Sequence, residues 1–163
     1  MSLFQTETDG MLELISFEIG GQEFCIDVRS VREIRGWTPA TPMPQSPGYV
    51  LGVINLRGVI MPVLDLRSRL GLGTTEPSSR HVIVVIEQDT RTAGVLVDRV
   101  QETFQVAASL LQAPPAMGLQ LGDHFVDAII PLGDRMLSRL VVGALLPLET
   151  ARIAEAGRQV EAA

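Results

Sequence analysis

The chain has 163 residues, close to the usual size of one domain, and 46% of them are hydrophobic. Its net charge is −6 and all 13 cationic residues are arginine, which excludes a catalytic lysine, a lysine-dependent phosphate loop and a basic nucleic-acid surface. Only seven residues are aromatic, whereas 17 are Val and 11 are Ile. This composition predicts an aliphatic core built from strands.

The start of the chain predicts a hairpin. A flexible polar lead occupies residues 1–12, and two largely apolar runs follow at 14–19 and 22–27. Gly20 and Gly21 separate these runs, and glycine readily adopts the positive φ values that a tight turn requires. We therefore expect two antiparallel strands here.

The next segments combine an ambiguous region, a loop and a second hairpin. Residues 28–33 fit either a short helical turn or a strand, because apolar residues recur at positions 28, 31 and 34. Four prolines between 38 and 48 require an extended loop, since proline lacks a backbone donor and restricts the residue before it. Residues 52–55 and 59–65 predict strands around a turn at 56–58.

Short strands also dominate the second half of the chain. Long helices between strands are missing from the pattern, which argues against a doubly wound nucleotide-binding fold. We predict an all-β barrel or sandwich, with one domain at 13–150 and a tail of helical composition at 151–163. The expected elements are strands at 81–87, 93–97 and 100–106, a helical turn at 107–112, and a hairpin of 125–132 and 136–142 around 133–135.

Candidate catalytic residues are few. Asp65 and Asp98 each follow an apolar run, so a carboxylate pair in a small β-barrel hydrolase is one hypothesis, although strand-end aspartates more often bind nearby backbone or arginine groups. His81 and His124 are far apart and lack zinc-ligand companions, so we expect both to be solvated. Cys25 lies between two apolar residues of a predicted strand and is expected to be buried. Neither a metal nor a cofactor is predicted.

The most specific pattern is the run GVINLRGVIMPVLDLR at 52–67. It resembles the signature of the CheW family of chemotaxis adaptors. Further blocks agree with that family in order and spacing, and the resemblance covers roughly residues 13–150. These blocks are FCID and VREIRG within 24–36, GVLVDRV at 94–100 and LGDRML at 132–137.

The resemblance implies two SH3-like five-stranded β-barrels around a shared apolar core, without enzymatic activity or a cofactor. It also implies a cytoplasmic adaptor, recruited to membrane-bound receptor arrays, that couples methyl-accepting chemoreceptors to the histidine kinase CheA. The implied partners are the receptor's helical cytoplasmic tip and the kinase's regulatory domain, with no nucleic acid and no membrane insertion. An adaptor of another chemosensory pathway, controlling surface motility or gene expression, is the alternative.

Carried over residue by residue, the family's receptor-binding positions fall on Val31, Glu33, Gly52, Asn55 and Arg57. We expect Arg57 in an exposed turn, with Glu33 holding its guanidinium through a bidentate pair. The alternatives are an exposed ion pair without function and an asparagine that only caps the turn.

Three further expectations concern other positions. Val31 and Val53 would contact the side of a receptor helix, unless they are ordinary core valines. Met117 is the candidate kinase-side contact that the resemblance implies. Ser138 and Arg139 place polar residues in a late apolar strand, and an edge position for that strand would explain them.

Overall fold

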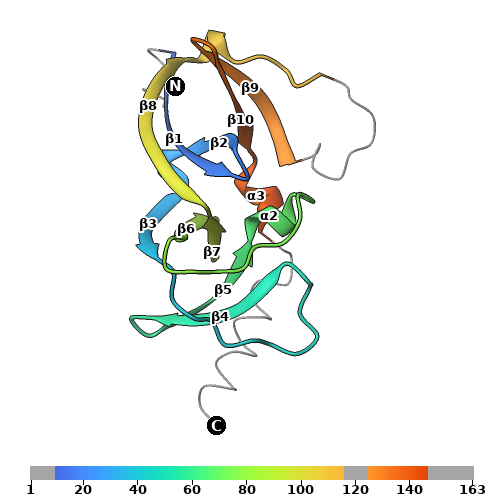
Figure 1. Cartoon of the computed structure of the whole chain (residues 1–163). Helices are drawn as coiled ribbons and strands as arrows, with labels where there is room; N and C mark the ends of the chain where they lie inside the picture. The colour runs from blue at the N-terminus through green and yellow to red at the C-terminus, as the bar shows by residue number, and fades with distance from the viewer. Residues whose placement is uncertain (1–9, 116–124, 147–163) are drawn as a thin grey trace.

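The computed structural model describes residues 10–115 and 125–146, and in these residues ten strands form two five-stranded sheets (Figure 1). Sheet 1 contains β1 (Met11–Ile19), β2 (Gln22–Asp27), β8 (Arg99–Ala107), β9 (Val126–Leu132) and β10 (Arg135–Leu140). Sheet 2 contains β3 (Val31–Gly36), β4 (Val50–Leu56), β5 (Val59–Asp65), β6 (Val82–Gln88) and β7 (Arg91–Val97). The helical turns are η1 (Val28–Ser30), α2 (Leu66–Arg69), η2 (Ala108–Leu110) and α3 (Val142–Leu145).

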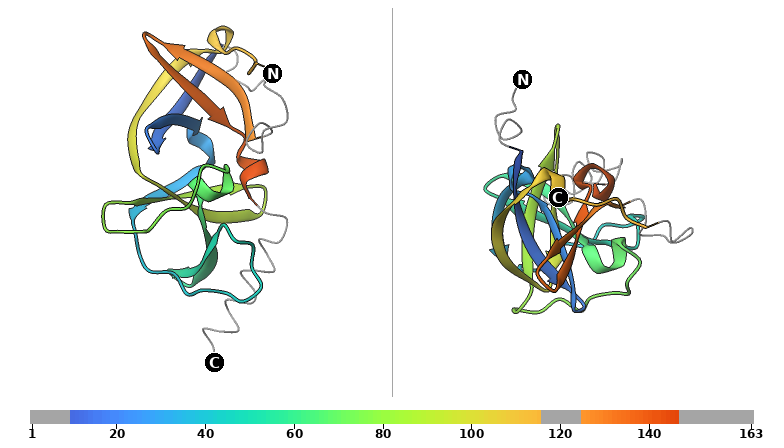
Figure 2. Two further views of the ribbon diagram at one scale, coloured as in Figure 1. Left: turned by 45° about the vertical axis from the view of Figure 1, so that its right-hand side comes forward. Right: turned by 90° about the horizontal axis from the view of Figure 1, so that it is seen from above.

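The two sheets share one topology of mixed pairing. Their strand orders are β8-β1-β2-β10-β9 and β3-β6-β7-β5-β4, and each contains one parallel pair, β2 with β10 and β5 with β7. The chain enters sheet 1, builds all of sheet 2, and returns to complete sheet 1. Figure 1 and the left view of Figure 2 show sheet 1 above sheet 2, with α2 and α3 on one side of the seam between them.

A shared apolar core joins the sheets. Phe17 and Ile26 contribute to it from sheet 1, and Leu64 and Val84 contribute from sheet 2, each no more than 1% exposed. Each sheet also has a smaller apolar cluster of its own. The cluster of sheet 1 surrounds Leu14, and that of sheet 2 is formed mainly by strands β4 to β7. Because most strands bury apolar side chains on both faces, the core is large although no strand in residues 10–115 and 125–146 exceeds nine residues.

The all-β prediction is confirmed, and so are its three turns. Gly20 and Gly21 have φ of 58° and 81° between β1 and β2, the geometry of a primed hairpin turn. The ambiguous residues 28–33 form a 3₁₀ turn followed by the start of β3. Strand β1 begins at Met11, two residues before the predicted start of the domain at 13.

The edge-strand explanation for Ser138 and Arg139 is wrong. Strand β10 lies inside sheet 1, between β2 and β9. The Arg139 guanidinium instead donates to both carboxylate oxygens of Asp127 on β9, at 2.9 and 3.1 Å. A cross-strand ion pair therefore accounts for a charge within this strand.

Candidate interaction surface

The β4–β5 turn presents Arg57 in a strained backbone conformation. Arg57 has φ of 53° and Gly58 has φ of 87°, so both central residues of this hairpin turn are left-handed. Asn, Asp or Gly usually occupies the first such position, because other side chains pay a steric cost there. An arginine at this position is one of three described non-glycine residues with positive φ, and such strain often marks a functional site.

Asn55 holds this turn in place. Its Oδ1 accepts a hydrogen bond from the Gly58 backbone N–H at 2.8 Å. The capping alternative for Asn55 is therefore confirmed, and the amide group stabilises the conformation that projects Arg57 outward. A direct contact of Asn55 with a receptor stays a prediction.

Arg57 pairs with Glu33 across the surface of sheet 2. Arg57 Nη2 donates to Glu33 Oε1 at 2.5 Å, with the arginine side chain 70% exposed. The expected bidentate geometry is wrong, because the other oxygen of Glu33 faces Arg35 Nη1 at 3.5 Å. One carboxylate thus contacts two guanidinium groups, and the hydrogen bond from Arg57 is the main cause that lowers the Glu33 pKa.

Arg35 is a member of this site that the sequence reasoning missed. Residues 33 and 35 are two apart on β3, so their side chains emerge on one face of the strand. The alternating burial of β3, half-buried at 31, 33 and 35 and exposed between them, shows this face directly. Side chains two positions apart lie on the same face of a strand, so the spacing of Glu33 and Arg35 in VREIRG could have identified Arg35 as the third charged residue of the site.

An open groove of about 300 Å³ lies beside the Glu33–Arg57 pair. Met61 and Val85, both buried in the core of sheet 2, contribute apolar lining, and Val59 at its side is 54% exposed. A second ion pair, Arg32 with Glu87, also lines the groove. Apolar lining beside charged side chains is the usual anatomy of a protein–protein contact.

The other predicted receptor-binding positions have different environments. Val31 is half-buried and packs against the shared core, whereas Val53 is only 1% exposed, so the expected helix contact of Val53 is wrong. Gly52 is buried, with φ of 147°, and a Cβ built there would lie 2.4 Å from the Thr41 carbonyl oxygen. Gly52 thus permits the proline loop to pair closely with β4. Met117 and His124 lie outside the described residues.

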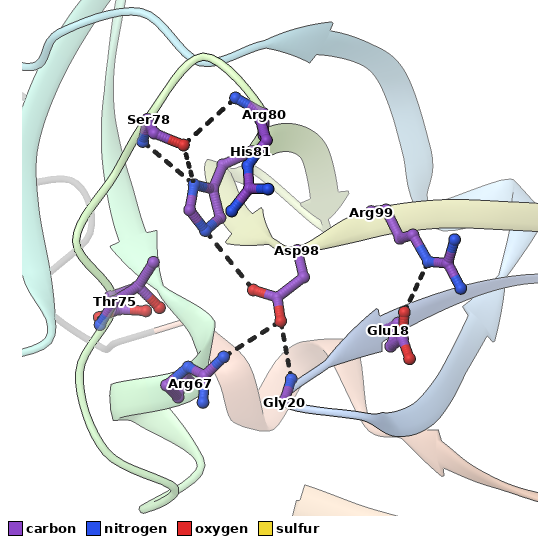
Figure 3. Close-up of polar contacts among 10 residues, drawn as sticks. Glu18, Gly20, Arg67, Thr75, Ser78, Arg80, His81, Asp98 and Arg99 are labelled. Atoms are coloured by element: carbon purple, nitrogen blue, oxygen red, sulfur yellow. Dashed lines mark hydrogen bonds and ion pairs between the residues drawn. The ribbon is translucent and has the colours of Figure 1, made fainter.

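The two candidate catalytic aspartates serve separate structural contacts. Asp65 is 2% exposed, and its Oδ2 accepts from the Thr75 backbone N–H at 2.7 Å. Asp98 Oδ2 accepts from the Gly20 backbone N–H at 2.8 Å and from Arg67 Nη2 at 3.1 Å (Figure 3). The two carboxylates share no partner among these contacts, so the geometry gives the hydrolase hypothesis no support.

His81 is mostly buried, and Cys25 is completely buried. The expectation of a solvated His81 is wrong: its side chain is 15% exposed, its Nδ1 accepts from the Ser78 backbone N–H at 3.0 Å, and its Nε2 lies 3.6 Å from Asp98. Cys25 is completely buried, as predicted, and burial raises the pKa of its thiol to about 12. A thiol protonated throughout the physiological range is a poor nucleophile. Among the described residues, no group of His, Cys, Asp or Glu side chains is arranged to hold a metal ion.

A family model for the CheW-like domain matches residues 13–149. The chain belongs to the CheW family. Proteins of this family are non-enzymatic scaffolds, which excludes the hydrolase hypothesis outright. The predicted fold of two SH3-like subdomains is also confirmed.

Relatives support this membership along most of the chain. The Chemotaxis protein CheW of Rhizobium meliloti is 44% identical over 142 residues, which is 87% of this chain and 92% of that protein. The Probable chemotaxis protein CheW of Rhizobium etli is 46% identical over 136 residues, 83% of this chain and 88% of that protein. The crystal structure of the scaffolding protein TtCheW from Thermoanaerobacter tengcongensis has a TM-score of 0.73 at 28% identity, covering 80% of this chain and 88% of that one.

The family assigns the chain to chemotaxis signalling as an adaptor. None of the described helices is both long enough and apolar enough to cross a membrane.

Proposed function

We propose that this chain couples methyl-accepting chemoreceptors to the histidine kinase CheA, in the cytoplasm beside receptor arrays. Family membership supports this proposal, and the high identity to two rhizobial proteins named for chemotaxis favours that pathway over the alternative of surface motility or gene expression. The helical cytoplasmic tip of the receptor and the regulatory domain of the kinase are the proposed partners.

The receptor-binding surface, in this proposal, is centred on Arg57. The single observation that carries it is an arginine held in a left-handed turn, with its guanidinium paired to Glu33 yet 70% exposed. A pair that served only stability would not require backbone strain to expose its cation. The groove beside it offers apolar contact for the side of a receptor helix.

Arg57→Ala tests this proposal through co-sedimentation with receptor-containing membranes and CheA. Receptor binding and receptor-dependent kinase activation should both fall, because the variant lacks the guanidinium that recognises the receptor. The free energy of unfolding should stay close to the wild-type value, since Arg57 is a surface group. Binding to the isolated regulatory domain of CheA should persist.

Arg29→Ala is the matched control. Arg29 is 71% exposed and also pairs with a carboxylate, Asp27, but it lies outside the groove. This variant should sediment with receptors as the wild type does. Normal receptor binding and kinase activation by Arg57→Ala, or its failure to fold, would show that this turn is not the receptor-binding surface.

The charge reversal Glu33→Arg with Arg57→Glu distinguishes orientation from recognition. If the guanidinium itself touches the receptor, the reversed pair restores the contact between positions 33 and 57 but leaves receptor binding impaired.

The kinase-side contact at Met117 stays a prediction. Its test is a Met117→Ser variant measured against the regulatory domain of CheA.

A further inference from the structure

A second polar pocket lies at the seam between the two sheets. It has a volume of about 440 Å³ and is lined by Arg67, Arg80, His81, Asp98 and Arg99. Asp98 stands where the chain passes from β7 of sheet 2 to β8 of sheet 1, and Arg67 lies on α2. Every lining residue is charged or titratable, so the pocket suits a charged ligand and not an apolar one.

The carboxylate of Asp98 is already fully engaged. One oxygen accepts hydrogen bonds from Gly20 and Arg67, and the other faces His81 Nε2 at 3.6 Å. The guanidinium of Arg99 turns away from Asp98 and donates to Glu18 at 2.6 Å (Figure 3). The acids near this pocket are therefore committed to other arginines or to backbone.

Arg80 is left with an unbalanced charge. Its side chain forms no ion pair or hydrogen bond with any residue in 10–115 or 125–146. Figure 3 shows its guanidinium beside the His81 ring, on the side that faces Asp98. A locally positive pocket in a chain of net charge −6 favours an anionic ligand.

His81 forms a fixed wall of the pocket. Its Nδ1 accepts from the Ser78 N–H, so the proton of the neutral ring resides on Nε2. That N–H is directed at Asp98, whose Oδ1 lies 3.6 Å from Nε2. Because the loop backbone orients the ring in advance, little ordering is required when a ligand arrives.

We propose that this seam pocket binds an oxyanion, either a phosphate or a carboxylate group. Arg80 supplies the guanidinium donor, Arg67 stays on Asp98 and contributes its positive field, and the His81 ring forms a wall of the pocket. Guanidinium forks match the planar oxygens of carboxylates and phosphates, which makes this chemistry the natural ligand class. Binding of an oxyanion here requires neither a receptor nor a kinase.

An NMR titration of the full chain with inorganic phosphate tests the proposal. Ionic strength is held constant with sodium chloride, so that specific binding is separated from screening. We expect saturable shifts of the Arg80 side-chain Nε–H and of the His81 ring signals. Arg80→Gln should weaken phosphate binding roughly tenfold, as expected for a lost charge-assisted hydrogen bond.

Arg32→Gln is the matched control, because Arg32 is an exposed arginine outside this pocket. It should leave phosphate affinity unchanged. The free energy of unfolding of Arg80→Gln should equal that of the wild type, because Arg80 contributes no ion pair among the described residues. Lost binding in that variant then reports the site and not the fold.

A parallel titration with a capped tetraglutamate peptide identifies the source of the oxyanion. Saturable shifts with phosphate alone indicate a free phosphate ligand. Saturable shifts with the peptide alone, or a higher affinity for the peptide than for phosphate, indicate that the ligand is an acidic side chain. If neither probe gives saturable shifts at constant ionic strength, or if Arg80→Gln binds as the wild type does, the cluster only clasps the two sheets and the proposal is wrong.

Discussion

Arg57 and Arg67 both pair with a carboxylate, yet the two ion pairs have opposite characters. Arg57 is 70% exposed and its pair with Glu33 joins elements of one sheet. Arg67 is 26% exposed, and its partner Asp98 also accepts from Gly20 of the other sheet. The first pair presents a cation to solvent, whereas the second secures the seam between two halves of the molecule.

The difference shows that the sign and spacing of charges do not reveal their role. An exposed pair gains little free energy because water and salt screen it. A half-buried carboxylate with several donors is costly to remove, because its partners are left without an acceptor. Mutations at the two regions should therefore separate stability from recognition, and a substitution in the core shared by the two sheets sets the scale of effects.

Leu64→Ala should have the largest effect and calibrates the comparison. Leu64 is completely buried in β5 and belongs to the core that the two sheets share, so its truncation should cost about 2–5 kcal/mol of unfolding free energy. Urea denaturation followed by circular dichroism measures this change. A loss of unfolding free energy below about 0.5 kcal/mol lies far outside the usual range for a buried leucine, and it would show that the shared core lies elsewhere.

Gly52→Ala should destabilise the protein by about 3 kcal/mol, because overpacking and backbone strain each cost roughly 1–3 kcal/mol. The added Cβ would meet the Thr41 carbonyl oxygen at 2.4 Å in a backbone with φ of 147°. Any loss of receptor binding in this variant would result from loss of structure. Arg57→Ala, in contrast, should lose receptor binding while it stays folded. Gly36→Ala, where a Cβ meets no atom within 4 Å, is the control for denaturation experiments.

Asp98→Ala should cost about 1–3 kcal/mol, because it leaves donors on Arg67 and Gly20 without their acceptor. Glu87→Ala, which breaks the exposed pair with Arg32, should cost no more than about 1 kcal/mol. Both values follow from urea denaturation at one ionic strength. Equal costs for the two variants would contradict a special role of the seam.

The smallest expected effect is a change in the pKa of Glu33. This pKa lies below its ordinary value of 4.5, with the Arg57 hydrogen bond as the main cause. A lowered pKa stabilises the folded state above the unfolded pKa, and this contribution is lost as the pH falls through the folded pKa. In Arg57→Ala the pKa should rise toward 4.5, though only in part, because Arg35 stays beside the carboxylate. Carboxyl-carbon NMR titration measures it, and an unchanged pKa would mean that the pair is absent in solution.

The Glu33–Arg57 site shows which features of an interaction surface the local sequence pattern can predict. Arg57 belongs to a turn that glycine placement predicts, whereas Glu33 belongs to a segment that the pattern left open between a helical turn and a strand. The family blocks brought the two residues into one hypothesis. The single-contact geometry did not follow, because β3 and β4 stand at opposite ends of the strand order and only the folded sheet brings Arg57 to Glu33. The seam was missed for the same reason: Gly20, Arg67 and Asp98 are distant in sequence. Arg35 was missed although its spacing from Glu33 is a property of the sequence.

The sequence by itself determined the aliphatic all-β character, the three hairpin turns and the buried state of Cys25. These properties depend on side-chain period and on residues that tolerate positive φ, which act over a few positions. Only the tertiary structure decided that β10 is an interior strand, that His81 is mostly buried, and that Asp98 connects the two sheets. The parallel pairing of β2 with β10 joins residues more than a hundred positions apart, and such a pairing forms only when the whole apolar core closes around it.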